Sequence, residues 1–223
     1  MEKYISTIKL LSGGFVITLE IFAYTLVFSV ILGLLVSKGR MSRNPVIRSL
    51  VRIYISVMRG TPLMLQLLLV YYLPYYMFGV KTGNIKIGPY SYDFIATIIA
   101  FTVNYAAYFA EIFRSGIQSM PKGQYEAAQI LGFSKSQTFF RIILPQVFKR
   151  VLPAMTNEII TLVKDTSLSR ILSIKEMFFF SSSAAARMSS IMPFIIAGVF
   201  YYVFNGIIEI TMNRVEKKLD YYQ

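Results

Sequence analysis

Five long apolar stretches restrict the fold of this chain more than any other feature. An α-helix needs about 20 apolar residues to cross the roughly 30 Å of hydrocarbon in a bilayer. Stretches of about that length cover residues 13–36, 62–80, 94–112, 142–165 and 191–212. The fourth is the weakest, because it is interrupted by Pro145, Lys149, Arg150, Pro153 and Glu158. We therefore expect an all-α integral membrane protein with five transmembrane helices, organised as one transmembrane domain over residues 1–223.

Basic residues are concentrated on one side of these predicted helices. The chain has 23 Lys and Arg against 11 Asp and Glu, a net charge of +12, although 55% of it is hydrophobic. Fifteen of the 23 cations lie in three segments: between the first and second stretches, between the third stretch and the start of the fourth, and in the C-terminal tail. Because basic loops stay in the cytoplasm, this pattern predicts an outer N-terminus and an inner C-terminus. The polar surface is too small for a nucleic-acid binder, so we expect no nucleic-acid partner.

The residue types that are missing narrow the possible chemistry. The chain has no Cys and no His, which excludes the usual zinc sites, a His- or Cys-ligated haem and a His-based catalytic triad. It also has no Gly-x-x-x-x-Gly-Lys-Ser/Thr loop, so we do not expect it to hydrolyse a nucleotide on its own. We therefore expect no catalytic residues, no metal site and no cofactor.

An odd number of spans also bears on the mechanism. Secondary transporters commonly carry two related halves in one chain, and five spans without an internal repeat do not divide in that way. We expect instead half of a pore, which a second copy or a related chain completes. An autonomous channel or ion-coupled carrier is the alternative.

The loop after the third stretch, residues 121–137, is expected to present a short helix at the cytoplasmic face. Pro121 and Gly123 break the preceding helix, and a new one can run over residues 124–131 until Gly132 ends it. Ser134 then has the character of an N-cap for a further helix. The small side chains of Glu126-Ala127-Ala128 would let another surface approach closely, although a plain connecting helix is equally compatible with this local pattern.

Several short motifs follow one another in a fixed order along the chain. They are Arg59-Gly60-Thr61-Pro62-Leu63, Ala110-Glu111-Ile112-Phe113-Arg114, Pro121-Lys122-Gly123-Gln124, Glu126-Ala127-Ala128 with Gly132, Leu144-Pro145-Gln146, and Lys164-Asp165-Thr166-Ser167-Leu168. Their order resembles the permease subunits of ATP-binding cassette importers for polar amino acids such as histidine, glutamate, glutamine, arginine and cystine. The resemblance extends over residues 13–218, with mild departures at Met120 and Gln129.

This resemblance implies a type I importer permease in a bacterial cell membrane. It implies that the E-A-A helix docks on a separate ATPase subunit, with the coupling contact formed by Gly123, Glu126, Ala127, Ala128 and Gly132. Further implied partners are an extracytoplasmic solute-binding protein, a second permease that is identical or homologous, and membrane lipid.

Polar residues at membrane depth are candidates for the substrate pathway, because they are costly to bury there. Glu158 is the strongest, since a carboxylate can accept the ammonium group of an amino acid; the alternative is an ion pair between helices. Asn104 and Tyr105 are candidates for which interhelical packing is the favoured alternative. The full set of pathway candidates is Glu158, Asn157, Asn104, Tyr105 and Gln66.

Gln66, Arg59 and residues 166–190 allow further interpretations. Gln66 either faces the pore or satisfies backbone groups freed by Pro62. Arg59, at a predicted junction, contacts either lipid phosphate or the E-A-A loop. Residues 166–190 are expected to form a short helix that caps the outer mouth and serves as a platform for the binding protein.

Overall fold

The computed structural model describes residues 2–82 and 85–219, and these are mostly helical, as the sequence predicts. Two short strands, β1 (Lys86–Ile87) and β2 (Tyr90–Ser91), pair antiparallel. The helices are α1 (Glu2–Arg40), α2 (Pro45–Gly60), α3 (Leu63–Phe78), α4 (Tyr92–Gln118), α5 (Lys122–Ile130), α6 (Lys135–Gln137), the π-helix η2 (Thr138–Ile143), α7 (Leu144–Asp165), the 3-10 helix η3 (Thr166–Leu172), α8 (Met177–Met188) and α9 (Met192–Lys218).

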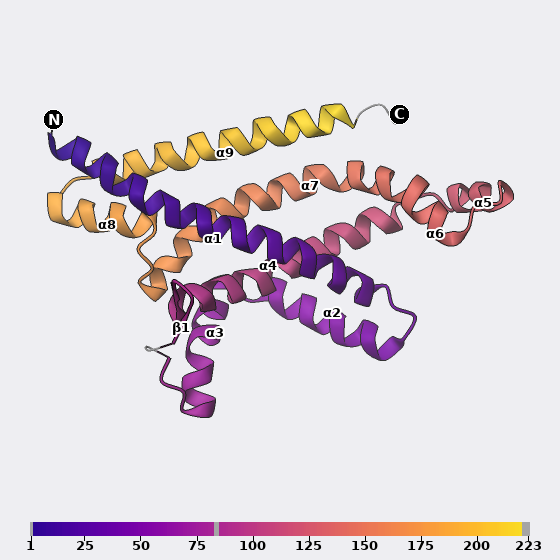
Figure 1. The fold of residues 1–223 in the computed structure, drawn as a ribbon, viewed down its shortest axis with the longest axis horizontal. Helices are drawn as coiled ribbons and strands as arrows, with labels where there is room; N and C mark the ends of the chain where they lie inside the picture. Colours follow the sequence, from indigo (N-terminus) through magenta and orange to yellow (C-terminus); the bar gives the residue numbers. More distant parts are fainter. Residues whose placement is uncertain (1, 83–84, 220–223) are drawn as a thin grey trace.

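The long helices lie lengthwise in one bundle, which has two distinct ends (Figure 1). Helix α4 packs against α1, α3 and α7, whereas α9 packs against α7 and α8. The short helices α5 and α6 lie at one end of the bundle, and α8 lies at the other beside the N-terminus. Helix α3 leaves the bundle axis (Figure 1). The chain therefore separates its predicted coupling loop from its predicted outer segment by the length of the bundle.

Helix α1 buries a narrow stripe of mostly small or polar side chains. Buried positions recur every three or four residues, which is the spacing of one helix face. Small residues let helix backbones approach closely within a membrane. A Cβ atom added to Gly33 would lie only 2.8 Å from Cβ of Phe109 in α4. The stripe consists of Thr7, Leu11, Gly14, Thr18, Ile21, Thr25, Ser29, Gly33 and Ser37.

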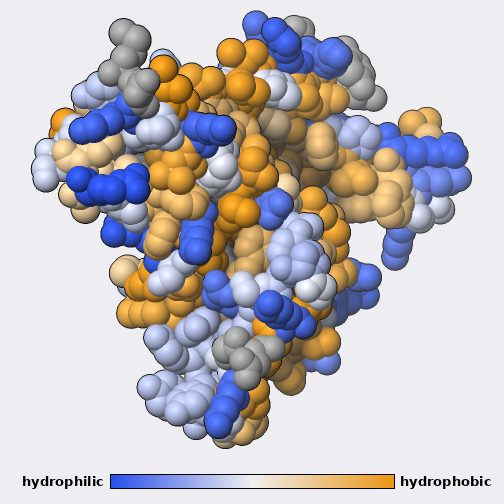
Figure 2. Space-filling model, turned by 60° about the vertical axis from the view of Figure 1, so that its left-hand side comes forward, coloured by the Kyte–Doolittle hydropathy of each residue, from blue (hydrophilic) through white to orange (hydrophobic). Residues whose placement is uncertain are grey.

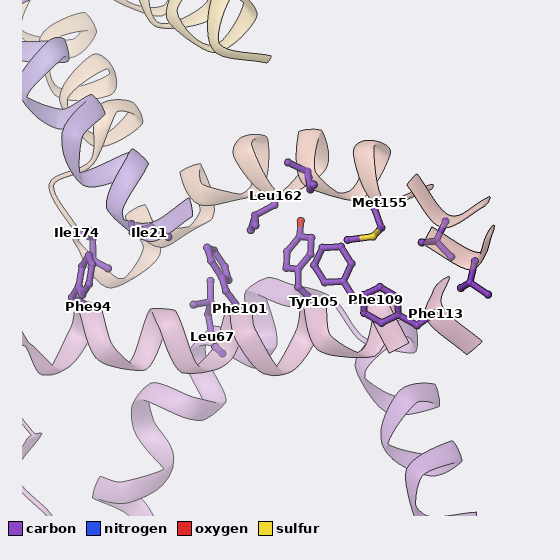
Figure 3. Close-up of a cluster of buried hydrophobic side chains, with 14 of the residues drawn as sticks. Ile21, Leu67, Phe94, Phe101, Tyr105, Phe109, Phe113, Met155, Leu162 and Ile174 are labelled. Carbon is purple, nitrogen blue, oxygen red and sulfur yellow. The ribbon is translucent and has the colours of Figure 1, made fainter. Parts of the chain in front are cut away.

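An aromatic ladder on α4 forms the centre of the core. Phe101, Tyr105, Phe109 and Phe113 are spaced four residues apart, so they lie on one face, and each is 0–7% exposed. Figure 3 shows these rings directed toward α7, where Met155 meets them. The centroids of neighbouring rings from Tyr105 to Phe113 are 6.4 Å apart. This ladder fixes α4 and α7 relative to each other, and both helices line the candidate site.

Three helices of the described residues are long and apolar enough to cross a membrane: α1, α4 and α9. Helices α2 and α3 qualify together as a fourth span, bent by 112° at their junction. Helix α7 does not reach the same standard, because Lys149, Arg150 and Glu158 lie within it. Apolar side chains cover much of the surface in Figure 2, as expected of a membrane protein. The count of five spans and the orientation stay predictions.

Candidate functional site

The bend between α2 and α3 is the first element that shapes the site. Asn44 caps α2, because its Oδ1 accepts the Val46 N–H at 2.9 Å. Pro62 ends this helix of sixteen residues, since a residue before proline avoids the helical region and Thr61 is extended (φ −120°, ψ 147°). The helix axis turns by 112° at this point, which leaves the last carbonyl groups of α2 without helical partners.

Gln66 and Asn104 satisfy these carbonyl groups. The carbonyl oxygen of Met58 accepts from Nε2 of Gln66 at 3.0 Å and from Nδ2 of Asn104 at 3.1 Å. Asn104 also donates to Oε1 of Gln66 at 2.9 Å, and Gln66 donates to Oγ1 of Thr61 at 2.7 Å. Both side chains are buried. Their contacts are those of residues that hold α2, α3 and α4 together at the bend.

Replacing Asn104 by leucine should lower the free energy of unfolding by about 2 kcal/mol, because it leaves the buried Oε1 of Gln66 without its donor. The measurement is thermal unfolding of the purified chain in detergent. Asn157→Leu is the matched control, since Asn157 is exposed on α7. Equal unfolding temperatures for Asn104→Leu and the wild type would show that Asn104 does not hold the bend.

Tyr105 is also engaged within the protein. Its hydroxyl donates to Oδ2 of Asp165 at 2.7 Å, and its side chain is 2% exposed. Asp165 is the last residue of α7, so this hydrogen bond joins the middle of α4 to the end of α7. Asn104, Gln66 and Tyr105, three of the five predicted pathway residues, therefore have hydrogen-bond partners within the protein. Asn104 and Gln66 are partners of each other.

Glu158 lies in a polar groove of about 460 Å³, which we call the α4–α7 groove. One face of α4 and one face of α7 form its walls, and the end of α2 closes it. Glu158 is partly exposed there, whereas the neighbouring Asn157 is exposed and does not line the groove. The lining residues are Arg59, Tyr108, Glu111, Ile112, Arg114, Ser115, Gly116, Ser119, Arg150, Val151, Ala154 and Glu158.

Several charges in the α4–α7 groove form a network. Arg114 donates to Glu111 from Nε and Nη2, at 3.0 and 2.6 Å to Oε2. Nε of Arg40, at the end of α1, lies 3.6 Å from Oε1 of Glu111. Arg150 on α7 donates from Nη1 to the carbonyl oxygen of Ser119 at 2.7 Å. These contacts connect α1, α4 and α7 at the end of the bundle that carries α5.

The structure shows a contact of Arg59 that the sequence did not suggest. Its guanidinium group lies over the ring of Tyr108 in α4, with Cζ 5.2 Å from the ring centroid. The side chain is exposed and lines the α4–α7 groove together with Glu158. The junction between α2 and α3 therefore places a cation in the groove.

The predicted E-A-A helix is α5, and it ends at Gly132 as expected. Gly132 has a left-handed backbone (φ +79°), and the N–H of Phe133 bonds to the carbonyl oxygen of Ala128 at 3.0 Å. Such a terminus satisfies the last carbonyl groups of a helix and favours glycine. Ser134 caps α6 through a reciprocal capping box with Gln137, so it is an N-cap as predicted.

The surface of α5 differs in one respect from the predicted coupling set. Gly123, Glu126, Ala127 and Gly132 are exposed, whereas Ala128 is 1% exposed and packs inward.

Sequence reasoning missed two exposed apolar residues beside this set. Ile130 is 86% exposed and Leu131 is 74% exposed. Two adjacent apolar residues directly before the terminating Gly132 are the signal that could have identified them. Together with the exposed coupling residues they give the end of the bundle an apolar surface suited to a protein partner.

At the opposite end, the predicted outer segment forms η3 and α8. Glu176 is fully buried there, and it caps α8 by accepting the N–H groups of Phe178 and Phe179, each at 2.6 Å. It lies outside the helices that can span a membrane. Burial raises the pKa of Glu176 to about 7, although the two N–H groups act in the opposite direction.

Glu176 should make stability depend on pH. Because its folded pKa exceeds the ordinary 4.5, the folded chain binds more protons than the unfolded chain between these values. Stability should therefore fall by up to about 3 kcal/mol as pH rises from about 4.5 to 7. Glu176→Gln should remove this slope in thermal unfolding, and Glu209→Gln, which changes an exposed carboxylate on α9, should retain it. An unchanged slope in Glu176→Gln would contradict the assignment.

Comparisons with known proteins agree with this arrangement. The sequence profile of a family described as "Binding-protein-dependent transport system inner membrane component" matches residues 29–221. The L-cystine transport system permease protein TcyB of Bacillus subtilis (strain 168) is 35% identical, over 96% of this chain and 88% of its own. The arginine transport system permease protein ArtQ of the same organism is 35% identical, over 96% and 94%.

A solved structure is similar along nearly the whole chain. A chain in the crystal structure of an amino acid ABC transporter with histidines has a TM-score of 0.84 and 30% identity, and 96% of each chain is covered. The match of the family profile spans most of the sequence and includes α4, α5 and α7, which build the groove and the exposed helix described above. The chain therefore belongs to the family of binding-protein-dependent transport system inner membrane components, and it is a multi-pass protein of the bacterial cell membrane.

Proposed function

We infer that this chain is the transmembrane permease subunit of an ATP-driven importer, which moves a polar amino acid into the cytoplasm. The observation that carries this proposal is the position of the α4–α7 groove. The groove contains Glu158, and its two walls lead to α5, whose exposed residues suit an ATPase partner. The similarity to permeases named for L-cystine and arginine supports the substrate class.

The proposed mechanism uses five spans: α1, α2 with α3, α4, α7 and α9. The N-terminus is outside and the C-terminus is inside, so α5 faces the cytoplasm. ATP hydrolysis takes place in two partner subunits, and no bond of the substrate is broken by this chain. Closure of the ATPase subunits moves α5, and α5 transmits the motion to α4 and α7 because it connects them.

Partners complete the pore on both sides of the membrane. A second permease, identical or homologous, supplies the other half of the pathway. An extracytoplasmic binding protein delivers the amino acid at the outer end, where α8 lies with η3. Basic residues at the cytoplasmic end also meet anionic lipid.

Within the pathway, Glu158 is proposed to accept the ammonium group of the substrate, with Asn157 beside it. Asn104, Gln66 and Tyr105 shape the pathway through the hydrogen bonds described above. Gly123, Glu126, Ala127 and Gly132 are proposed to contact the ATPase directly, and Ala128 supports the helix from beneath.

The test is reconstitution in liposomes with the ATPase and the binding protein encoded in neighbouring reading frames. ATP hydrolysis should rise several-fold when the binding protein carries its amino acid, and uptake should require ATP. An autonomous channel or ion-coupled carrier predicts uptake by the purified chain alone, without ATP. Uptake of that kind, or hydrolysis that no amino acid stimulates, would reject the proposal.

A further inference from the structure

Five charged side chains line the α4–α7 groove, and three of them are already engaged. Glu111 accepts from Arg114, and Arg150 donates to the carbonyl oxygen of Ser119. These groups have partners on the protein, so a substrate would have to displace existing hydrogen bonds to reach them.

Arg59 and Glu158 are the two that remain. Within residues 2–82 and 85–219, neither side chain has a hydrogen bond or an ion pair within 4.0 Å. They interact electrostatically across the groove, Arg59 also interacts electrostatically with Glu111, and its guanidinium group lies over the ring of Tyr108. The groove thus offers one available cation and one available anion.

We propose that Arg59 binds the α-carboxylate of the substrate while Glu158 binds its α-ammonium group. This inference rests on the proposed function and adds a residue that determines what the site recognises. Arginine is suited to the role because its planar guanidinium group donates two parallel hydrogen bonds to a carboxylate. Tyr108 would hold the guanidinium plane in position, since arginine stacks on aromatic rings.

The remaining walls of the groove determine how selective this site is. Ile112, Gly116, Val151 and Ala154 are small or apolar, and the remaining uncharged polar residues of the lining are Tyr108, Ser115 and Ser119. The volume of about 460 Å³ exceeds that of a single amino acid. The site therefore recognises the α-carboxylate and the α-ammonium group, which all α-amino acids share, and tolerates different side chains.

The test is equilibrium binding of radiolabelled L-arginine and L-cystine to the purified permease–ATPase complex, without binding protein. Each probe is compared with its α-amide, which lacks the carboxylate charge. The wild type should prefer the amino acid by about 10-fold or more, as expected for a charge-assisted hydrogen bond. Arg59→Gln should remove the preference without weakening binding of the amide, and Arg59→Lys should retain part of it. Glu158→Gln should weaken the amino acid and the amide alike, because both carry the ammonium group.

Arg52→Gln is the matched control, because Arg52 is an exposed arginine of the same helix that does not line the groove. A preference that survives Arg59→Gln, or that Arg52→Gln removes equally, would overturn the inference. The inference would also be overturned if the wild-type complex bound neither probe although the loaded binding protein stimulated its ATP hydrolysis. The proposed function would stand in that case. Absence of stimulated hydrolysis would reject the proposed function itself.

Discussion

Replacing Gly14 by alanine should lower the free energy of unfolding by about 3 kcal/mol, which is the upper range for adding a methyl group to a packed interior. A Cβ atom at Gly14 would lie 2.6 Å from Cδ2 of Phe180 and 2.9 Å from both N and Cα of Met177. The Phe180 ring could rotate, but the backbone of Met177 cannot move without shifting the start of α8. The larger side chain therefore separates α1 from α8.

The neighbouring glycine provides the control for this prediction. Gly13 is exposed on α1, and a Cβ atom there would meet nothing within 4 Å. Because alanine favours a helix over glycine by up to about 1 kcal/mol, Gly13→Ala should leave stability unchanged or raise it. Thermal unfolding of both variants in the same detergent is the measurement. Similar unfolding temperatures for the two variants would show that α1 and α8 do not pack as closely as described.

The second large effect is expected at α5, the predicted E-A-A helix. Ile130→Asp should reduce association with the ATPase subunit by about 100-fold or more, because it removes an apolar contact worth about 2 kcal/mol and adds a charge that must be desolvated. Glu126→Arg should have a similar effect through reversal of charge. The measurement is the amount of ATPase that co-purifies with the permease from membranes.

Ile191→Asp is the matched control for this experiment. Both side chains are largely exposed, Ile191 to 69% and Ile130 to 86%. Ile191, however, directly precedes α9 at the opposite end of the bundle. The control variant should retain full ATPase association. If Ile130→Asp and Glu126→Arg both retain it as well, α5 is not the surface that the ATPase binds.

Periodic motifs and turn residues made much of the helical arrangement predictable. Gly132 and Ser134 end and begin helices where their local chemistry favours it, and Pro62 ends α2 because it restricts Thr61 to extended backbone. These are local effects, which depend on a few neighbouring residues. The buried face of α1 was not identified, because in this helix size rather than hydropathy distinguishes the inner face.

The candidate site was harder to predict because its residues meet across long sequence separations. Asn104 and Gln66 have the same polar character as a substrate ligand, and only their contacts with Met58, 46 and 8 residues away, show what they hold. The residues next to Arg59 in the sequence are likewise compatible with a side chain that contacts lipid, contacts a loop or lines a groove. Its place beside Glu158 depends on how α2, α4 and α7 pack, and that packing is a tertiary property.

The aromatic ladder of α4 has a mechanical consequence. A straight helix of 27 residues is about 40 Å long, and its ring contacts with α7 resist bending along that length. Such a helix moves as a rigid rod, one end of which lies next to α5. A tilt of about 5° at that end displaces the far end by about 3.5 Å, by the geometry of a rod of this length. A displacement of about one carbon-atom diameter at the end of α4 that follows β1 and β2 can thus result from a small rotation at α5.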